Sequence, residues 1–448
     1  MEKLFGTDGI RGKANEFPLT PEYVTRIGSA IGEVLGRTGE RRLALIGRDT
    51  RLSGEMIENG LAAGLMSQGF DTIHLGVLTT PAIAFLTHTL GARCGISISA
   101  SHNPFEDNGI KVFGGDGWKV PDASEIEIET LAQTELPQGT EPGKIGRRND
   151  DHKPITNYIH FLIDAIQHQP ILRDKRIVVD CNNGATYDLA PGVLHDLGAE
   201  IIALNISPDG VNINRGYDSL EPKLLRDTVL REHADWGVQF DGDGDRAVFV
   251  DERGNYVDGD FVLAILARDF QSRGLLNKNM VVSTVMANIG LEKSLNEIGA
   301  MMVRTAVGDR WVTERMREQG AMLGGEQSGH ILLFDAGHTT GDGLYTAVRM
   351  ADVLARTGKP FSELASCMKH YPQVLINVRV PRKPPFEQFP AIGEQVEKSR
   401  EELRDGARIL LRYSGTENLA RVMIEGSDLE AITREAQAIA KVIQETIK

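Results

Sequence analysis

Three aspartates, Asp241, Asp243 and Asp245, alternate with glycines in the segment DGDGDR. Glycine permits tight turns, and clustered carboxylates supply the oxygen ligands that a hard divalent cation takes. The segment therefore predicts a Mg²⁺ site that a phosphate group completes. An EF-hand is disfavoured because Arg246 stands where that loop needs glycine, and because residues 247–250 have the pattern of a strand. A solvated acidic turn is the remaining alternative.

A serine hydroxyl follows an alternating strand in the segment GISISASHNP, residues 95–104. Isoleucine and serine alternate with the period of a strand, and the proline then interrupts the pattern. Ser101 is thus presented on a loop at a strand end, where catalytic groups are often found. A strand-end turn without any catalytic role is the alternative. A second extended run, residues 110–113, contains Lys111.

Two further loops carry groups suited to sugars or phosphates. GGEQSGH contains Glu326, Ser328 and His330, a carboxylate and polar groups that suit sugar hydroxyls. RYSGTENLAR places two guanidiniums and small hydroxyl residues around a turn, which predicts a phosphate cradle. Its members are Arg412, Ser414, Gly415, Thr416 and Arg421. Each loop taken alone is also compatible with an ordinary polar turn.

Two arginine-bearing segments near the N-terminus give weaker signals. Arg11 lies at a glycine-rich turn in FGTDGIRG, and GRDTR, residues 47–51, follows the first strand. Pairing with surface carboxylates is the alternative for the arginines of both segments. Arg11 is the better candidate for a functional role.

The elements that must position these loops repeat three times along the chain. Residues 43–75, 177–204 and 280–303 each follow the order strand, helix, glycine, strand. Units of this length form right-handed βαβ crossovers in a parallel sheet. A further strand then leads into the serine, acidic or GGEQSGH loop. The sequence therefore predicts three similar α/β domains, each presenting one loop at the carboxyl end of a strand.

The last part of the chain has a different pattern. An alternating strand over 374–380 precedes a charged helix, two strands over 409–412 and 419–424, and a final helix from about Leu429. This order predicts a smaller C-terminal α+β domain.

The predicted fold class is α/β, with mixed, mainly parallel sheets in three domains and the α+β domain arranged with them around a central cleft. The predicted boundaries are 1–150, 151–254, 255–370 and 371–448. Linkers are expected near 148–154, 252–260 and 368–373.

Composition excludes several classes of partner. The chain has 448 residues, 41% hydrophobic and 25% charged, which is typical of a globular protein with several cores. Its net charge of −14 argues against nucleic acids and anionic membranes as partners. The three cysteines are scattered, and neither a signal-peptide core nor a run of about 18 apolar residues is present. We expect a cytoplasmic protein.

A serine, a metal loop, a sugar loop and a phosphate cradle are the parts of an enzyme that transfers phosphoryl groups on sugar phosphates. The chain resembles the α-D-phosphohexomutases over essentially its whole length, through SASHNP, DGDGDR, GEQSGH and RYSGTE. Within that family it most resembles the phosphoglucosamine mutase subgroup, through FGTDGIRG, DNGIKVF and AVGDR at residues 306–310.

The resemblance implies an isomerase, an intramolecular phosphotransferase that interconverts glucosamine 6-phosphate and glucosamine 1-phosphate. The implied route passes through phosphoserine at Ser101 and glucosamine 1,6-bisphosphate, and it feeds UDP-N-acetylglucosamine synthesis for cell-wall precursors. One Mg²⁺ per subunit is implied, held by Ser101 and the three aspartates, with glucosamine or glucose 1,6-bisphosphate as activator. The implied partners are a small-molecule sugar phosphate and a second copy, in a homodimer formed through the first domain.

The resemblance also implies roles for single residues. Ser101, Lys111 and Arg11 are expected to be catalytic, with the proton-exchanging group open among Lys111, Arg11 and His330. His102 is expected to point differently from Ser101 and is not assigned as the base. Asn418 stands where the family usually has proline, which suggests a more mobile phosphate loop. The expected substrate-binding residues are Arg246, Gly308, Asp309, Glu326, Ser328, His330, Arg412, Ser414, Gly415, Thr416 and Arg421.

Three alternatives remain open at this point. A phosphomannomutase or phosphoglucomutase would perform the same chemistry on another sugar. A metal-dependent sugar phosphatase would use an aspartate of DGDGDR as its nucleophile. A binding protein without catalysis would not need the complete set of loops.

Overall fold

The computed structural model describes residues 4–6, 8–37, 42–134, 137–166, 171–218, 221–335, 337–404, 406–414 and 418–448. Within these residues the strands form four sheets, and the chain divides into two compact units. The first unit, residues 1–286 and 298–367, contains three sheets. The second unit, residues 287–297 and 368–448, contains the fourth. Among the described residues, no helix is both long and apolar enough to cross a bilayer.

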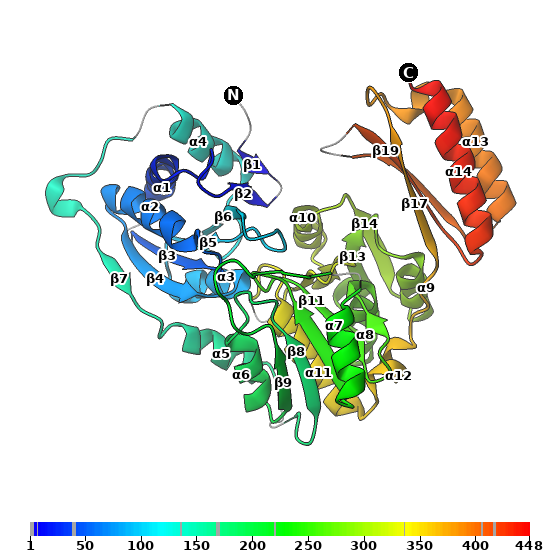
Figure 1. Ribbon diagram of the computed structural model, residues 1–448, viewed down its shortest axis with the longest axis horizontal. Helices are drawn as coiled ribbons and strands as arrows, with labels where there is room; N and C mark the ends of the chain where they lie inside the picture. Colours follow the sequence, from blue (N-terminus) through cyan, green and yellow to red (C-terminus); the bar gives the residue numbers. More distant parts are fainter. Residues whose placement is uncertain are drawn as a thin grey trace. The chain divides into compact units, whose positions relative to one another are not determined.

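The first sheet has the strand order β1-β2-β6-β5-β3-β4-β7. Its inner strands are apolar runs, and β3 is buried along almost its whole length, as expected for parallel strands covered by helices. Helices α1 and α2 lie side by side, and α3 packs on β3 and β5 (Figure 1). The strands are β1 (Phe5–Gly6), β2 (Gly9–Lys13), β3 (Leu43–Arg48), β4 (Asp71–Val77), β5 (Cys94–Ile98), β6 (Asp107–Gly114) and β7 (Arg148–Asp150). The helices are α1 (Pro21–Gly36), α2 (Gly54–Ser67), α3 (Thr80–Thr89) and α4 (Asp122–Gln133), followed by the 3-10 turn η1 (Pro142–Lys144).

The second and third sheets repeat the centre of the first. Their strand orders are β12-β11-β10-β8-β9 and β14-β13-β15-β16. The second sheet comprises β8 (Arg176–Asp180), β9 (Glu200–Leu204), β10 (Trp236–Phe240), β11 (Ala247–Asp251) and β12 (Tyr256–Val257), with α5 (Ile155–Asp164), α6 (Leu189–Asp196) and α7 (Lys223–Arg231). The third comprises β13 (Met280–Thr284), β14 (Met301–Thr305), β15 (Leu323–Gly325) and β16 (Ile331–Leu333), with α8 (Gly259–Ser272), η2 (Asn277–Asn279), α10 (Asp309–Gln319), α11 (Gly343–Thr357) and α12 (Phe361–Ala365).

The same strand arrangement occurs in all three sheets. Strands β3, β8 and β13 each pair in parallel with the two strands that follow them in the chain, and the next strand is antiparallel. The predicted parallel βαβ units are therefore confirmed. Because β5, β10 and β15 occupy equivalent places, their carboxyl ends present the serine loop, the acidic loop and the GGEQSGH loop in equivalent positions.

Two of the expected linkers contain regular structure. Arg148–Asp150 forms β7, which pairs in parallel with β4 at the edge of the first sheet. The stretch near 252–260 contains β12 and the first turn of α8, whose N-terminus is capped by Asp258. Edge strands of two or three residues are too short to show the alternation that makes a strand recognisable in sequence.

The second unit is built on an antiparallel sheet of order β17-β19-β18. Helices α13 and α14 lie side by side against it (Figure 1). Its elements are α9 (Ile289–Glu297), β17 (Gln373–Arg379), η3 (Phe386–Gln388), α13 (Pro390–Leu403), β18 (Arg408–Tyr413), β19 (Leu419–Glu425) and α14 (Leu429–Thr446). The predicted C-terminal α+β domain is confirmed.

Candidate functional site

Ser101 lies just beyond the end of β5 and is buried. Its φ of 52° is in the left-handed region, which residues other than glycine, asparagine and aspartate seldom adopt. In this conformation the Ser101 hydroxyl donates a hydrogen bond of 2.6 Å to Asp241 Oδ2. The strained backbone therefore aims the predicted nucleophile at the acidic loop.

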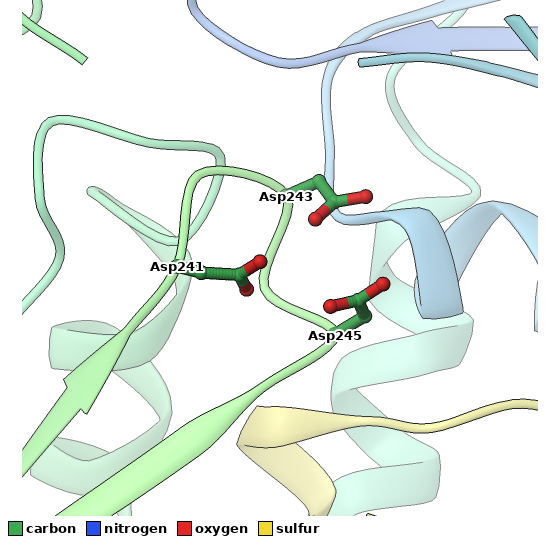
Figure 2. A group of neighbouring side chains, drawn as sticks. All are labelled: Asp241, Asp243 and Asp245. Atoms are coloured by element: carbon green, nitrogen blue, oxygen red, sulfur yellow. The ribbon is translucent and has the colours of Figure 1, made fainter. Parts of the chain in front are cut away.

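The acidic loop joins β10 to β11 and is turned by Gly244, whose φ is 71°. Figure 2 shows the side chains of Asp241, Asp243 and Asp245 converging from this loop. One oxygen from each carboxylate lies within 4.8 Å of the others, and all three residues are buried. Burial, together with the charges of Asp245 and Asp243, raises the pKa of Asp241 well above its usual range.

The acidic loop fits a divalent cation. Asp243 Oδ1 and Asp245 Oδ1 are buried and have no hydrogen-bond partner. Buried carboxylate oxygens are costly unless another group satisfies them, and an all-oxygen donor set is the one that Mg²⁺ prefers. A cation among these oxygens would also remove the repulsion that raises the pKa of Asp241.

Lys111 reaches the acidic loop from β6. Its Nζ lies 2.9 Å from Asp243 Oδ2, 3.3 Å from Asp245 Oδ2 and 2.9 Å from Asp8 Oδ2. Burial opposes its charge, but these carboxylates raise the pKa of Lys111 well above its usual range. Against the effect of burial, Lys111 and then His330 hold the pKa of Asp245 well below its usual range. Lys111 is therefore a buried cation beside the predicted metal ligands.

A pocket of about 390 Å³ opens beside Asp245. Its size is within the range of small-molecule sites. Seven of the predicted site residues line it: Arg11, Asp245, Arg246, Gly308, Asp309, Glu326 and His330. They come from the parts of the chain that build all three α/β sheets, so the tertiary structure brings together groups that are up to 319 positions apart in the chain.

The GGEQSGH loop contributes two ionisable groups, the carboxylate of Glu326 and the imidazole of His330. Glu326 accepts a hydrogen bond of 3.2 Å from the Gly308 N–H, and burial raises its pKa. His330 lies with Nδ1 3.6 Å from Asp245 Oδ1. Burial works against the charge of His330, but Asp245 outweighs it and raises the pKa to about 9. Ser328 is half-buried on the same loop and does not line the pocket.

The phosphate cradle predicted in the second unit is described in part. Arg412 on β18 and Arg421 on β19 face each other in register. The Arg421 guanidinium donates to Ser414 Oγ over 3.4 Å, and burial together with Arg421 lowers the pKa of Arg412. Two adjacent guanidiniums favour an anion between them. Gly415 and Thr416 lie outside the described residues.

Sequence reasoning missed several residues of the pocket. Asp8 and His102 line it, and Asp8 forms ion pairs with Arg11, Lys111 and Lys119. The expectation that His102 points away from Ser101 is wrong, because its Nδ1 lies 3.4 Å from Ser101 Oγ. Burial, Arg246 and Arg11 lower the pKa of His102. Asp8 stands within the quoted FGTDGIRG segment, whereas no motif marked Lys119.

Comparison with known proteins identifies the family. Models of the phosphoglucomutase/phosphomannomutase family match domain I at residues 2–138, domain II at 156–254, domain III at 258–371 and the C-terminal domain at 375–442. The chain belongs to the phosphoglucomutase/phosphomannomutase family. Three α/β domains and a C-terminal domain, the architecture predicted from sequence, are therefore confirmed.

Individual members of the family match over almost the full chain. A phosphoglucosamine mutase of Syntrophotalea carbinolica is 48% identical over 449 residues, which is 99% of this chain and 97% of the relative. A solved phosphoglucomutase/phosphomannomutase family protein of Burkholderia thailandensis is 24% identical with a TM-score of 0.81, over 99% of this chain and 97% of that one. The N-acetylphosphoglucosamine mutase of Aspergillus fumigatus, solved in complex with GlcNAc-6P and magnesium, is 17% identical with a TM-score of 0.69, over 99% and 96%. The prediction of a phosphohexomutase is confirmed.

Proposed function

We propose that this family member interconverts glucosamine 6-phosphate and glucosamine 1-phosphate. The observation that carries the proposal is the Ser101 hydroxyl, which is aimed at Asp241 over 2.6 Å at the carboxyl end of β5. The choice of sugar is supported by the relative named phosphoglucosamine mutase, which is 48% identical.

The chemistry requires a carrier because O6 and O1 lie far apart on a hexose ring. Phosphorylated Ser101 donates its phosphoryl group to the free sugar oxygen, so that the bond from phosphorus to serine breaks as the bond to the sugar forms. In this step the sugar hydroxyl gives up its proton and the departing oxygen of Ser101 takes one up, which regenerates the serine hydroxyl. The resulting bisphosphate reorients, and its other phosphate returns to Ser101 by the reverse step. Each half of the reaction conserves one phosphoryl group and one proton.

We infer that Asp241, Asp243 and Asp245 hold one Mg²⁺ per subunit together with the phosphate of Ser101. When bound, the ion supplies positive charge that neutralises the phosphoryl group being transferred. The two buried carboxylate oxygens that lack a hydrogen-bond partner, Asp243 Oδ1 and Asp245 Oδ1, support this inference. So does the magnesium bound to the Aspergillus fumigatus enzyme. Lys111 and Arg11 are proposed as the catalytic cations, since Lys111 contacts the acidic loop and Arg11 lines the pocket.

The proposed substrate contacts fall into two groups. Arg246, Gly308, Asp309, Glu326, Ser328 and His330 are proposed to bind the sugar and its reacting phosphate. The non-reacting phosphate is assigned to Arg412, Ser414, Gly415, Thr416 and Arg421. A glucosamine or glucose 1,6-bisphosphate activator would restore phosphate lost from Ser101. The homodimer and the cytoplasmic location stay predictions of the sequence.

The decisive experiment is a mass measurement of the protein incubated with glucose 1,6-bisphosphate, Mg²⁺ and glucosamine 6-phosphate. Trypsin releases residues 94–111, which contain Ser97, Ser99 and Ser101, so fragmentation must locate the phosphate within the peptide. We expect phosphate on Ser101 and production of glucosamine 1-phosphate. Ser101→Ala should lose both, whereas Ser124→Ala, on helix α4 and not among the residues that line the pocket, should retain both.

Other outcomes would identify another function. Phosphate on Asp241, or release of inorganic phosphate alone, would indicate a phosphatase. Faster turnover of mannose 1-phosphate or glucose 1-phosphate than of the glucosamine phosphates would indicate the phosphomannomutase or phosphoglucomutase specificity named in the family description.

A further inference from the structure

Arg51 lies beneath the serine loop, although its sequence context allowed a surface ion pair. Only 1% of the residue is exposed. Its Nε donates to Asp49 Oδ2 over 2.9 Å. Its Nη2 donates to the carbonyls of Ser101 over 3.0 Å and Asn103 over 2.8 Å.

The remaining nitrogen of the guanidinium, Nη1, also donates two hydrogen bonds. Arg51 Nη1 donates to the carbonyl of Pro104 and, over 2.9 Å, to that of Asp107. An arginine has five N–H donors in a rigid planar fork, and here all five are engaged. Four of them bind consecutive parts of the loop that carries Ser101. The side chain therefore determines the path of that loop.

Asp49 connects Arg51 to the other side of Ser101. Its carboxylate accepts from Arg51 Nε and, over 2.6 Å, from Ser99 Oγ. Ser99 Oγ in turn accepts the Ser101 N–H over 2.9 Å. Both the N–H and the carbonyl of Ser101 are thus tied to the same buried ion pair.

A residue of the second sheet's loops acts on the same carbonyls. Asn214 Nδ2 donates to Ser101 O over 2.8 Å and to Asn103 O over 3.0 Å. The Ser101 carbonyl is therefore held from two sides. This arrangement matters because Ser101 has a φ of 52°, a conformation that the surrounding structure must maintain.

We propose that Arg51 is a positioning residue that, with Asn214, holds Ser101 in its left-handed conformation and thereby sets the direction of phosphoryl transfer. This proposal rests on the proposed function of Ser101. The guanidinium does not touch the reacting hydroxyl. It acts on the backbone carbonyls that fix where the hydroxyl points.

Arg51→Lys removes the planar guanidinium, and with it the hydrogen bonds to the backbone carbonyls, but keeps a positive charge opposite Asp49. A lysine ammonium presents three donors from one point and does not reach the four carbonyls that the fork binds. We expect kcat to fall about a hundredfold, as for a misplacement of about 1 Å, while KM stays unchanged. The matched control is Arg48→Lys, from the same GRDTR segment. Arg48 pairs with Glu55 and Glu58 and touches no part of the serine loop, so its variant should keep the wild-type kcat.

A crystal structure of Arg51→Lys separates this proposal from the proposed function. We expect Ser101 to leave the left-handed region and its hydroxyl to lose Asp241. A wild-type kcat, or a Ser101 that keeps its φ and its hydrogen bond to Asp241, would overturn the positioning role. Absence of mutase activity in the wild type would instead overturn the proposed function. If Arg51→Lys does not fold, Asn214→Ala decides: it removes two of the same carbonyl contacts, and an unchanged kcat would overturn the proposal.

Discussion

Replacing Lys111 with methionine is expected to destabilise the metal-free protein by about 3–5 kcal/mol, the usual cost of removing one partner from a buried ion pair. The ammonium is 2% exposed and contacts Asp243, Asp245 and Asp8. The gross Coulomb attraction summed over the three ion pairs is larger, since each pair contributes about 4 kcal/mol at 4 Å and an effective dielectric constant of 20. Desolvation of the charged groups offsets most of this attraction, so a destabilisation of about 3–5 kcal/mol is the one to expect.

The sharper expectation concerns Mg²⁺. Without Lys111, the buried carboxylates of Asp243 and Asp245 lose their nearest cation, so an added divalent cation has more charge to compensate. A ligand at about a hundred times its Kd stabilises by about 2.7 kcal/mol. We therefore expect Mg²⁺ to raise the thermal midpoint of Lys111→Met by more than it raises that of the wild type.

The assay is thermal unfolding followed by circular dichroism, in EDTA and in excess Mg²⁺. Lys119→Met is the matched control, because Lys119 contacts Asp8 and Asp309 but none of the three aspartates of the acidic loop. In EDTA the midpoint of Lys111→Met should fall by roughly 5 °C, because the unfolding entropy of a unit this large makes each kcal/mol worth only about 1–1.5 °C. Equal Mg²⁺ shifts in the wild type and both variants would refute the coupling of Lys111 to the acidic loop.

Three further outcomes are expected. Arg412→Ala should raise KM roughly tenfold or more, because charge-assisted contacts contribute about 1.5–3 kcal/mol each. Steady-state kinetics measure this, with Arg400→Ala on an exposed helix face as the control. Equal KM values for Arg412→Ala and Arg400→Ala would count against the phosphate cradle. Burial raises the pKa of Cys94 to about 12, so the native thiol should resist iodoacetamide at pH 8 while the half-buried Cys367 reacts. The thiol of the unfolded chain titrates near pH 8.5, so the stability that comes from keeping Cys94 protonated begins to be lost as the pH rises above about that value. Urea unfolding midpoints at pH 8 and pH 10 measure this loss. Rapid labelling of Cys94 in the native protein would contradict its burial. Gly244→Ala should weaken Mg²⁺ binding in calorimetry, since φ is 71° and the new Cβ would lie 2.7 Å from a threonine methyl; an unchanged Kd would remove the turn from the metal site.

The repeated architecture was predictable because its signals are local. Apolar runs, helix periods and the glycines after them mark each βαβ unit, and Gly69, Gly198 and Gly299 indeed have φ values of 81°, 104° and 70°. The edge strands β7 and β12 were not predictable, because segments of two or three residues form strands only when a neighbouring strand offers its edge.

The candidate site was predictable in its motifs but not in its contacts. DGDGDR and SASHNP identify their chemistry by residue type and spacing. Nothing in the sequence indicates that Lys111 contacts that acidic loop, or that His102 lies beside the serine hydroxyl. Those contacts depend on which loop ends meet at the edges of three separate sheets.

Residue types, their order and the periodic elements that present them can be read from the amino-acid sequence, since they follow from local backbone preferences and side-chain chemistry. Which charges are neighbours and which arginine is buried depends instead on how the sheets and their loops come together. Arg51 shows the physical reason. A guanidinium can leave water when all five of its donors find acceptors, and four of those acceptors are carbonyls about 50 or more residues further along the chain.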